Sequence, residues 1–208
     1  MSKVLSLVIL VISILSLCGW FWGMEFLTTF NNAAATIKPI TSICFILSAI
    51  QLISIAYNID HSSRIHTYVT TLMSSWILWI VFNVLTIAAF GSSFNVSSLF
   101  YGYLMEKPEV SEQVRHTFPS ISTFVSFTLV SLIGFIHLFN TKRAKKRLYV
   151  LSNILMVFGF LSAFGLFFGI SYIYNPFPKI SSGTSLPTAV CFILYSISIN
   201  NISKQIKQ

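Results

Sequence analysis

The sequence predicts an all-α integral membrane protein with six transmembrane helices, built as three repeated hairpins with both termini on the inner side. Apolar residues make up 55% of the 208-residue chain and charged residues 9%, with a mean hydropathy of +0.80. A soluble domain of this length would not keep such a composition in solution. Uncharged stretches of membrane-spanning length and a phrase that recurs three times complete the prediction. We expect one transmembrane domain over residues 1–208.

Six stretches are long enough to cross a bilayer. A hydrocarbon core about 30 Å thick needs about 20 apolar residues per helical crossing. The stretches that contain no Asp, Glu, Lys or Arg are 4–22, 39–58, 67–91, 119–140, 148–172 and 185–202. Segments such as "LVILVISILSLC" are apolar on every face, which favours helices over the alternating strands of a β-barrel.

The first and last stretches leave alternatives open. The last, 185–202, is short and rich in serine, so a five-crossing chain with an interfacial last helix is the alternative there. The first resembles a cleavable signal peptide because Lys3 precedes an apolar run. Against cleavage, Leu17 is too bulky for the small residue required near the cut, and Trp20 and Trp22 suit an interfacial anchor.

Basic residues orient the chain, because short loops rich in Lys and Arg stay on the cytoplasmic side. With the N-terminus inside, the inner segments hold nine of the 13 basic residues and one acid, Asp60. The nine are Lys3, Arg64, Lys142, Arg143, Lys145, Lys146, Arg147, Lys204 and Lys207. The outer segments hold four basic residues and four glutamates. We expect a bacterial cytoplasmic (inner) membrane protein that crosses the membrane several times.

The basic inner loop 141–147 is the strongest candidate for docking a cytoplasmic protein partner. The docking residues we predict are Lys142, Arg143, Lys145, Lys146 and Arg147. The alternative is a loop that only orients the helices and touches anionic lipid headgroups. The formal charge of +8 is explained by such short loops, so we expect membrane lipids as partners and no direct nucleic-acid binding.

A seven-residue phrase recurs in the even-numbered spans, as "TSICFIL" (41–47), "TFVSFTL" (123–129) and "TAVCFIL" (188–194). It divides the chain into hairpins of about 1–58, 67–140 and 148–203. The odd spans end near Gly23, Gly91 and Gly169. The residues that start the repeated helices are Pro39, Thr41, Pro119, Thr123, Pro187 and Thr188, with Thr36, Thr117 and Ser185 as possible caps. Their small and hydroxylated residues predict that the repeated helices lie inside the bundle.

The outer loop 92–118 is the one loop with a composition typical of recognition. The candidate residues are Phe100, Tyr101, Tyr103, Glu106, Glu109 and Glu112. Aromatics mixed with charges suit contact with an external protein or peptide, and they suit equally an amphipathic segment lying on the outer leaflet.

Catalytic, metal-binding and cofactor-binding constellations are not found in the sequence, so we expect a non-enzymatic protein without cofactors. The spans contain no ionisable group of the kind that ion-coupled transporters keep in the membrane, apart from His137. We expect His137 to extend to the interface and Asn83 to bond a neighbouring helix. His61 and His66 are expected on a solvated turn, the three cysteines pack as small apolar residues, and Trp76 and Trp79 pack first, or line a cleft.

The phrases "KPITSICFILSAI" (38–50) and "SLPTAVCFILYSI" (185–197) resemble the helix starts in multi-helix membrane sensory modules of bacterial signalling proteins. Such modules precede histidine kinase or diguanylate cyclase domains. The resemblance covers the first and third hairpins, whereas "FPSISTFVSFTLV" has its proline displaced. No output domain follows the last helix here, so the resemblance implies an output on a separate polypeptide.

These observations predict a membrane sensor or scaffold subunit, in a signalling system or, by analogy alone, in a bacterial defence system against phage. It would detect an outer-face or membrane event and signal to a cytoplasmic partner, with a homo-oligomer as one possible form. The alternative is an oligomeric channel or passive transporter. That alternative requires a continuous polar stripe, for which Ser42, Ser48, Asn83, Thr86 and Ser131 are the candidates.

Overall fold

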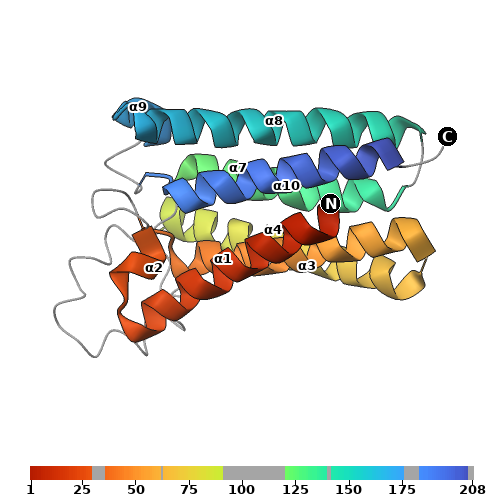
Figure 1. Cartoon of the computed structure of the whole chain (residues 1–208), viewed down its shortest axis with the longest axis horizontal. Helices are drawn as coiled ribbons and strands as arrows, with labels where there is room; N and C mark the ends of the chain where they lie inside the picture. Colours follow the sequence, from red (N-terminus) through yellow and green to blue (C-terminus); the bar gives the residue numbers. More distant parts are fainter. Residues whose placement is uncertain (30–35, 62, 91–119, 140–141, 176–182, 206–208) are drawn as a thin grey trace.

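The computed structural model describes residues 1–29, 36–61, 63–90, 120–139, 142–175 and 183–205. Within these ranges the chain is helical and contains no strand (Figure 1). The helices are α1 (Ser2–Trp22), α2 (Glu25–Thr29), α3 (Pro39–His61), α4 (Arg64–Phe90), α7 (Ile121–His137), α8 (Lys142–Phe167), α9 (Ser171–Tyr174) and α10 (Leu186–Gln205).

Five described helices are long and apolar enough to cross a membrane: α1, α3, α4, α8 and α10. The last of them, α10, was expected to be the weakest span, yet it qualifies with 20 residues. Helix α7 is apolar but has only 17 residues. Among the helices that correspond to the six predicted spans, the shortest is therefore the fourth rather than the sixth. The architecture is that of a multi-pass membrane protein.

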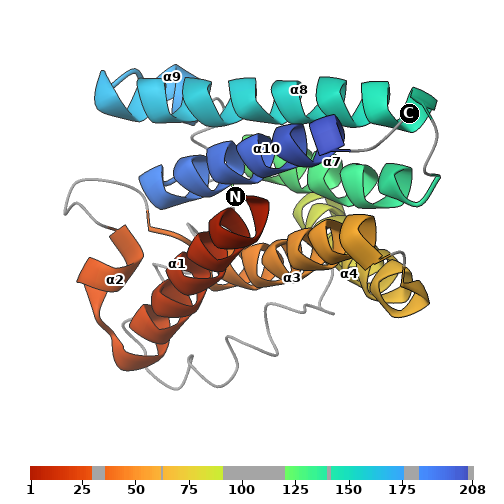
Figure 2. The same ribbon diagram turned by 45° about the vertical axis from the view of Figure 1, so that its right-hand side comes forward.

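The six long helices form a closed bundle in which each packs against the next, from α1 through α3, α4, α7, α8 and α10 back to α1. Two views show α7, α8 and α10 on one side and α1, α3 and α4 on the other (Figures 1 and 2). In the most apolar part of α3 and α10, 67% and 61% of residues are buried, against 28% in α1, 33% in α4 and 28% in α8. Helices α3 and α10 therefore line the interior.

Helix α1 turns a face of small residues toward the bundle. Its buried residues are Ser2, Ser6, Ile9, Ser13, Ser16 and Gly19, spaced three or four apart, while its large aliphatic side chains point outward. The Ser2 and Ser198 hydroxyls donate to each other's carbonyl oxygens, at 3.2 and 3.3 Å, and join α1 to α10. Because lipid supplies no hydrophobic force between helices, small residues that permit close approach take over that role.

Glycine follows α1 and α8, as the sequence predicts for the ends of these two helices. Gly23 after α1 and Gly169 after α8 have φ angles of 68° and 67°, a left-handed conformation that glycine adopts without strain. In both places the N–H of the next residue donates to the carbonyl five positions back, Met24 to Gly19 and Ile170 to Gly165, each at 2.8 Å. Gly91 lies outside the described residues.

The short helices α2 and α9 then pack against an earlier glycine of the preceding long helix, Gly19 in α1 and Gly165 in α8. A Cβ atom placed on Gly19 would lie 2.7 Å from Cβ of Leu27, and one on Gly165 would lie 2.8 Å from Cβ of Ile173. Both positions therefore require glycine. Further along, Ile37 N–H donates to Thr28 O at 3.0 Å and Thr184 N–H to Tyr174 O at 2.9 Å. The first and third hairpins thus share their turn in detail.

The basic run departs from its predicted form. Helix α8 begins at Lys142, so Arg143, Lys145, Lys146 and Arg147 lie on its first turns rather than in a loop. Lys and Arg are good helix formers, and no proline or glycine interrupts the run. The cations are therefore held on defined faces of a helix.

Candidate functional site

The centre of the bundle contains a polar cluster built around Gln51, a residue that the sequence reasoning missed. Gln51 lies near the middle of α3 and is fully buried. Its Nε2 donates to Ser74 Oγ on α4 at 2.7 Å and to Val130 O on α7 at 3.4 Å. Its Oε1 accepts from the Tyr195 hydroxyl on α10 at 2.7 Å. One amide therefore connects four helices.

The orientation of this amide follows from its partners. Only the nitrogen can donate to the Val130 carbonyl, so the oxygen must be the atom that faces the Tyr195 hydroxyl. The Ser74 hydroxyl donates a hydrogen bond to Thr70 O at 2.7 Å, and the Ser131 hydroxyl donates one to Ser74 O at 2.8 Å. Every described polar side chain of this central cluster is thus bonded, as a low-dielectric site requires.

Gly134 on α7 provides the space that the amide occupies. A Cβ atom at this position would overlap both Gln51 Nε2 and Ser74 Oγ. Glycine also carries no side chain that would separate α7 from α3 and α4. Its place in the sequence, "SLIGFIH", shows no sign of this role, whereas Gln51 is the only glutamine inside the six predicted spans and was a usable signal.

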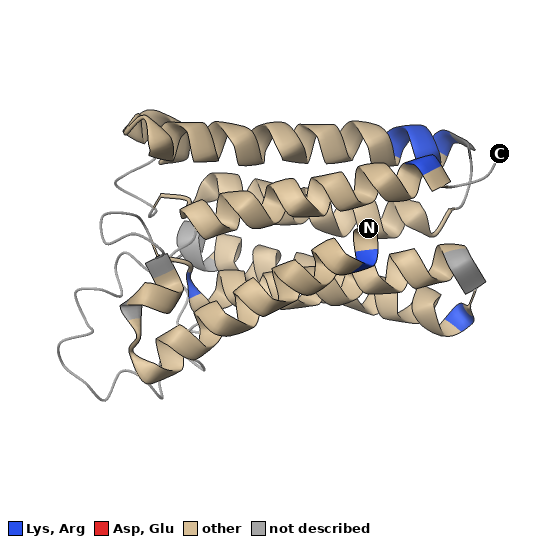
Figure 3. Ribbon diagram, viewed as in Figure 1, with Lys and Arg blue, Asp and Glu red and all other residues tan. Residues whose placement is uncertain are grey.

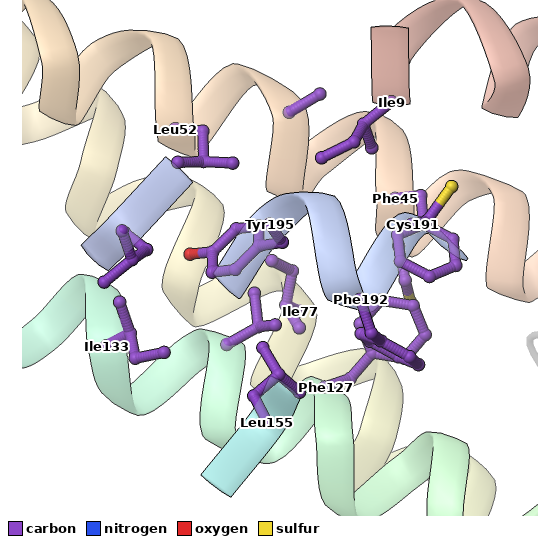
Figure 4. Packing of buried hydrophobic residues seen from close by; sticks show 14 of the residues in the cluster. Ile9, Phe45, Leu52, Ile77, Phe127, Ile133, Leu155, Cys191, Phe192 and Tyr195 are labelled. Carbon is purple, nitrogen blue, oxygen red and sulfur yellow. The ribbon is translucent and has the colours of Figure 1, made fainter. Parts of the chain in front are cut away.

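The same phenylalanine of each repeated phrase meets its equivalents on the axis of the bundle. Phe45, Phe127 and Phe192 contact one another pairwise, with ring centroids 4.8, 4.8 and 5.1 Å apart. All three are buried to within 2% of full burial. Figure 4 shows them gathered beside Cys191, with Tyr195 further along α10. Aromatic side chains therefore fill the axis next to the Gln51 cluster.

The predicted starts of the repeated helices are buried where they are described. Thr41, Thr123 and Thr188 are 2–3% exposed. Ser120 Oγ accepts from Thr123 N–H at 3.2 Å, and Ser185 Oγ accepts from Thr188 N–H at 3.4 Å, so Ser185 caps as predicted. Ser120, which was not predicted, has the same role on α7.

Two of the three prolines lie at these helix starts. Pro39 is the first residue of α3 and Pro187 the second of α10, while Pro119 and Thr117 lie outside the described residues. The candidate cap Thr36 instead accepts a bond from the Lys38 ammonium, at 3.4 Å. Burial lowers the pKa of Lys38 from its ordinary value.

Most described cations gather at one end of the bundle, as Figure 3 shows for the starts of α4 and α8 and the end of α10. Of the predicted docking residues, Arg143, Lys146 and Arg147 are exposed and Lys145 is half-buried. The side chain of Lys142 lies outside what the structure describes. A groove with a cavity volume of about 460 Å³ runs between α7 and α8 at this end. Its lining residues are Leu132, Ile136, Arg143, Lys146, Arg147, Val150 and Leu151.

Two expectations about polar residues were wrong. Asn83 donates to Trp79 O of its own helix at 2.8 Å, because its position on α4 faces away from the neighbouring helices. His137 does not extend to the interface but is 6% exposed, and neither ring nitrogen has a hydrogen-bond partner among the described residues. It is the last residue of α7, and its side chain turns into the bundle instead of toward the basic end.

The tryptophans, histidines and cysteines that the sequence analysis considered make packing contacts or local hydrogen bonds where they are described. Trp76 and Trp79 touch edge to face at 5.4 Å and are about half exposed on the outer surface of α4. His66 stacks on Tyr57, with its ring nitrogen 3.3 Å from Ser54 Oγ, while the His61 side chain is not described. Cys44 and Cys191 are buried and Cys18 is half-buried. No group of three metal-binding side chains occurs among the described residues.

The predicted outer recognition residues lie outside the described part of the chain. They are Phe100, Tyr101, Tyr103, Glu106, Glu109 and Glu112.

The polar stripe expected for a channel is divided among separate contacts. Ser42 donates to Ser16 on α1 at 3.3 Å, and Ser48 to Cys44 O of its own helix at 2.6 Å. Thr86 bonds Asn83 O, also within its helix, and Ser131 bonds α4. Ser42 and Ser131 therefore join neighbouring helices, whereas Ser48 and Thr86 bond within their own helices.

Comparison with protein-family models, curated proteins and solved structures finds no match to the chain.

Proposed function

We propose that the protein is a non-enzymatic membrane sensor or scaffold subunit that signals to a separate cytoplasmic partner. The carrying observation is the single buried amide of Gln51, which bonds side chains or backbone on α4, α7 and α10. Any displacement of one of these helices along its neighbours changes that set of bonds. We propose this contact as the two-state element that transmission across a membrane needs.

The free energy of each hydrogen bond in the Gln51 cluster is small enough for the bond to be exchanged during a change of helix packing. Interhelical hydrogen bonds in a membrane contribute about 0.6–2 kcal/mol each. Gln51 can therefore exchange one partner for another at a cost that a stimulus outside the membrane can supply. Gly134 and the serines around it offer small side chains past which helices can slide.

We further propose that the six long helices are three repeated hairpins, with the basic end on the cytoplasmic side of a bacterial inner membrane. The contact between Phe45, Phe127 and Phe192 supports the repeat, because equivalent positions of a three-fold arrangement meet on its axis. The matching turns at Gly23 and Gly169 support it independently. The concentration of cations at one end supports the orientation.

The resemblance to bacterial sensory modules supports the same function, and a place in a defence system remains an analogy. An oligomeric channel is the alternative. It is less well supported, because three phenylalanines fill the axis and the polar residues of the predicted stripe bond elsewhere.

The function is tested by crosslinking the protein in its native membrane and identifying what it captures. We expect wild type to capture a soluble protein that Gln51→Leu captures to a different extent, while a variant with Lys142, Arg143, Lys145, Lys146 and Arg147 changed to Gln loses it. The matched control is Trp76→Leu, on the outer surface of α4 away from both sites.

Each variant is first checked for membrane insertion. Loss of capture in the control as well would mean that the variants act through general damage. If inserted wild-type protein captures no soluble protein, the scaffold function is wrong, and ion or solute flux in liposomes becomes the experiment to perform.

A further inference from the structure

The cations at the start of α8 divide into two faces. Arg143, Lys146 and Arg147 are spaced three and four residues apart, which places them on one side of a helix. That side is the one that lines the groove against α7. Lys145 lies on a different side of α8 and is not among the groove residues. The groove is thus lined by three of the four cations whose side chains the structure describes in this run.

Beyond the cations, toward the middle of the bundle, the groove is lined by aliphatic side chains. Leu132 and Ile136 come from α7, and Val150 and Leu151 from α8. Leu132 is 40% exposed and Val150 46% exposed, so these walls face outward. From Arg143 to Leu151 the helix rises about 12 Å. The groove therefore runs from a charged rim at the basic end into the depth that acyl chains occupy.

The chain offers little negative charge to this rim. No aspartate or glutamate occurs after Glu112, so α7, α8 and α10 contain no carboxylate at all. The only acid that the sequence places near the basic end is Asp60, close to the end of α3. Three guanidinium and ammonium groups around an apolar groove complement a ligand that carries both an anion and a hydrocarbon chain.

We propose that this groove binds one anionic phospholipid, with its phosphate between Arg143, Lys146 and Arg147 and an acyl chain between Leu132 and Val150. A free phosphate would match the rim but leave the apolar walls uncovered. A zwitterionic lipid would match the walls but bring a cation to the rim. The inference goes beyond the proposed function, since lipid binding is measured on the protein alone, without a partner.

The test is native mass spectrometry of the full chain released from nanodiscs of phosphatidylcholine containing phosphatidylglycerol. We expect wild type to retain one phosphatidylglycerol in preference to phosphatidylcholine. Lys146→Gln/Arg147→Gln should weaken that preference by about fivefold for each cation removed. The matched control, Arg64→Gln/Lys204→Gln, removes the same charge from the same end outside the groove and should keep the preference of wild type.

A second variant tests the apolar half of the groove. Leu132→Trp fills the space between the helices and leaves all three cations, so we expect retention of phosphatidylglycerol to fall. Glycerol 3-phosphate, which carries the same anion without acyl chains, should not displace the bound lipid. Folding is checked by helical content and monodisperse elution, and Leu132→Trp keeps the test decisive if the charge variant does not fold.

Four results would overturn the proposal. Equal losses in both charge variants would mean attraction to surface charge without a site. Unchanged retention of phosphatidylglycerol in Leu132→Trp, or displacement of the bound lipid by glycerol 3-phosphate, would mean that the site binds the anion but not the acyl chain. If wild type shows no lipid preference while Lys146→Gln/Arg147→Gln loses partner capture, the rim is a protein docking face, and the proposed function stands while the lipid site falls.

Discussion

At the scale of single residues, the molecule depends on one glutamine placed where lipid surrounds the bundle. An uncharged amide with both ends bonded costs far less in hydrocarbon than a charge does. Gln51 therefore joins α3 to α4, α7 and α10 without the ionisable group that pumps and ion-coupled transporters keep.

The fit between Gln51 and Gly134 gives the first prediction. Gly134→Ala places a methyl group on Gln51 Nε2 and Ser74 Oγ, so we expect it to lower the free energy of unfolding by about 1–3 kcal/mol. In a Gln51→Ala background the same change should cost clearly less, because half of the overlap is gone. The measurement is reversible unfolding in mixed micelles, as a double-mutant cycle.

Gly169→Ala is the control for that cycle. A Cβ at Gly169 meets nothing within 4 Å, but its φ of 67° strains any other residue. Its cost should therefore be the same with and without Gln51. Equal costs for Gly134→Ala in the two backgrounds would contradict the contact between Gly134 and Gln51.

His137 gives a prediction of opposite sign. A buried imidazole with both nitrogens unbonded among the described residues carries a desolvation cost of about 1–3 kcal/mol. We expect His137→Phe, which keeps the ring shape, to leave stability unchanged or raise it in the same unfolding experiment. A loss of more than about 1 kcal/mol would show that the ring nitrogens have a stabilising partner.

At the scale of helices, stability comes from small residues that let helices approach closely. The serine face of α1 and the reciprocal bonds between Ser2 and Ser198 close the bundle. On the other side, Ser152 donates to Asn200, and Asn200 donates to Asn153 at 3.0 Å, which joins α8 to α10.

The packing of α1 on α3 is tested by crosslinking. Ser16 and Ser42 have their hydroxyl oxygens 3.3 Å apart, so Ser16→Cys/Ser42→Cys should form a disulfide rapidly under mild oxidation, in a chain whose native cysteines are replaced by alanine. Leu15→Cys/Ser42→Cys is the matched control, because Leu15 is 43% exposed on the outward face of α1. Equal crosslinking of both pairs would contradict the serine interface.

The positions of most long helices could be predicted from the sequence, whereas the start of α8 and the relative lengths of the spans could not. Uncharged stretches located five of the six long helices to within about three residues at each end, whereas α8 (Lys142–Phe167) begins and ends well before the predicted span 148–172. The glycines after α1 and α8 marked where these two helices end. The basic run was expected in a loop, because charge patterns locate the membrane boundary rather than the end of a helix. Its short length and its serines made 185–202 the weakest predicted span, although α7 is the shorter helix.

The central cluster escaped prediction for a different reason. Gln51 is neutral, and a search for ionisable groups passes over it. Tyr195 and Gly134 acquire their roles only through partners far away in the chain, with Tyr195 and Gln51 separated by 144 positions. His137 was expected at the interface because its distance from the basic run is short, but the direction of its side chain depends on how α7 packs.

At the scale of the whole molecule, the arrangement is a closed bundle with most of its described cations at one end (Figure 3) and a core of aromatic side chains (Figure 4) that adjoins the polar Gln51 cluster. Phe45, Phe127 and Phe192 fill one level of the axis and Gln51 crosses the next. In the function that we propose, a signal that reaches the basic end moves helices against each other through this core.

Pulsed electron spin resonance measures such a movement of the helices against each other most directly. Spin labels at Arg64→Cys and Tyr149→Cys, both exposed near the basic ends of α4 and α8, report their separation in liposomes, with Cys18 replaced by alanine. A pair within α4, Arg64→Cys/Leu72→Cys, is the control and should give one unchanged distance. We expect two distances between α4 and α8 in wild type and an altered ratio of the two in Gln51→Leu. One distance, identical in both proteins, would contradict a movement of α4 against α8.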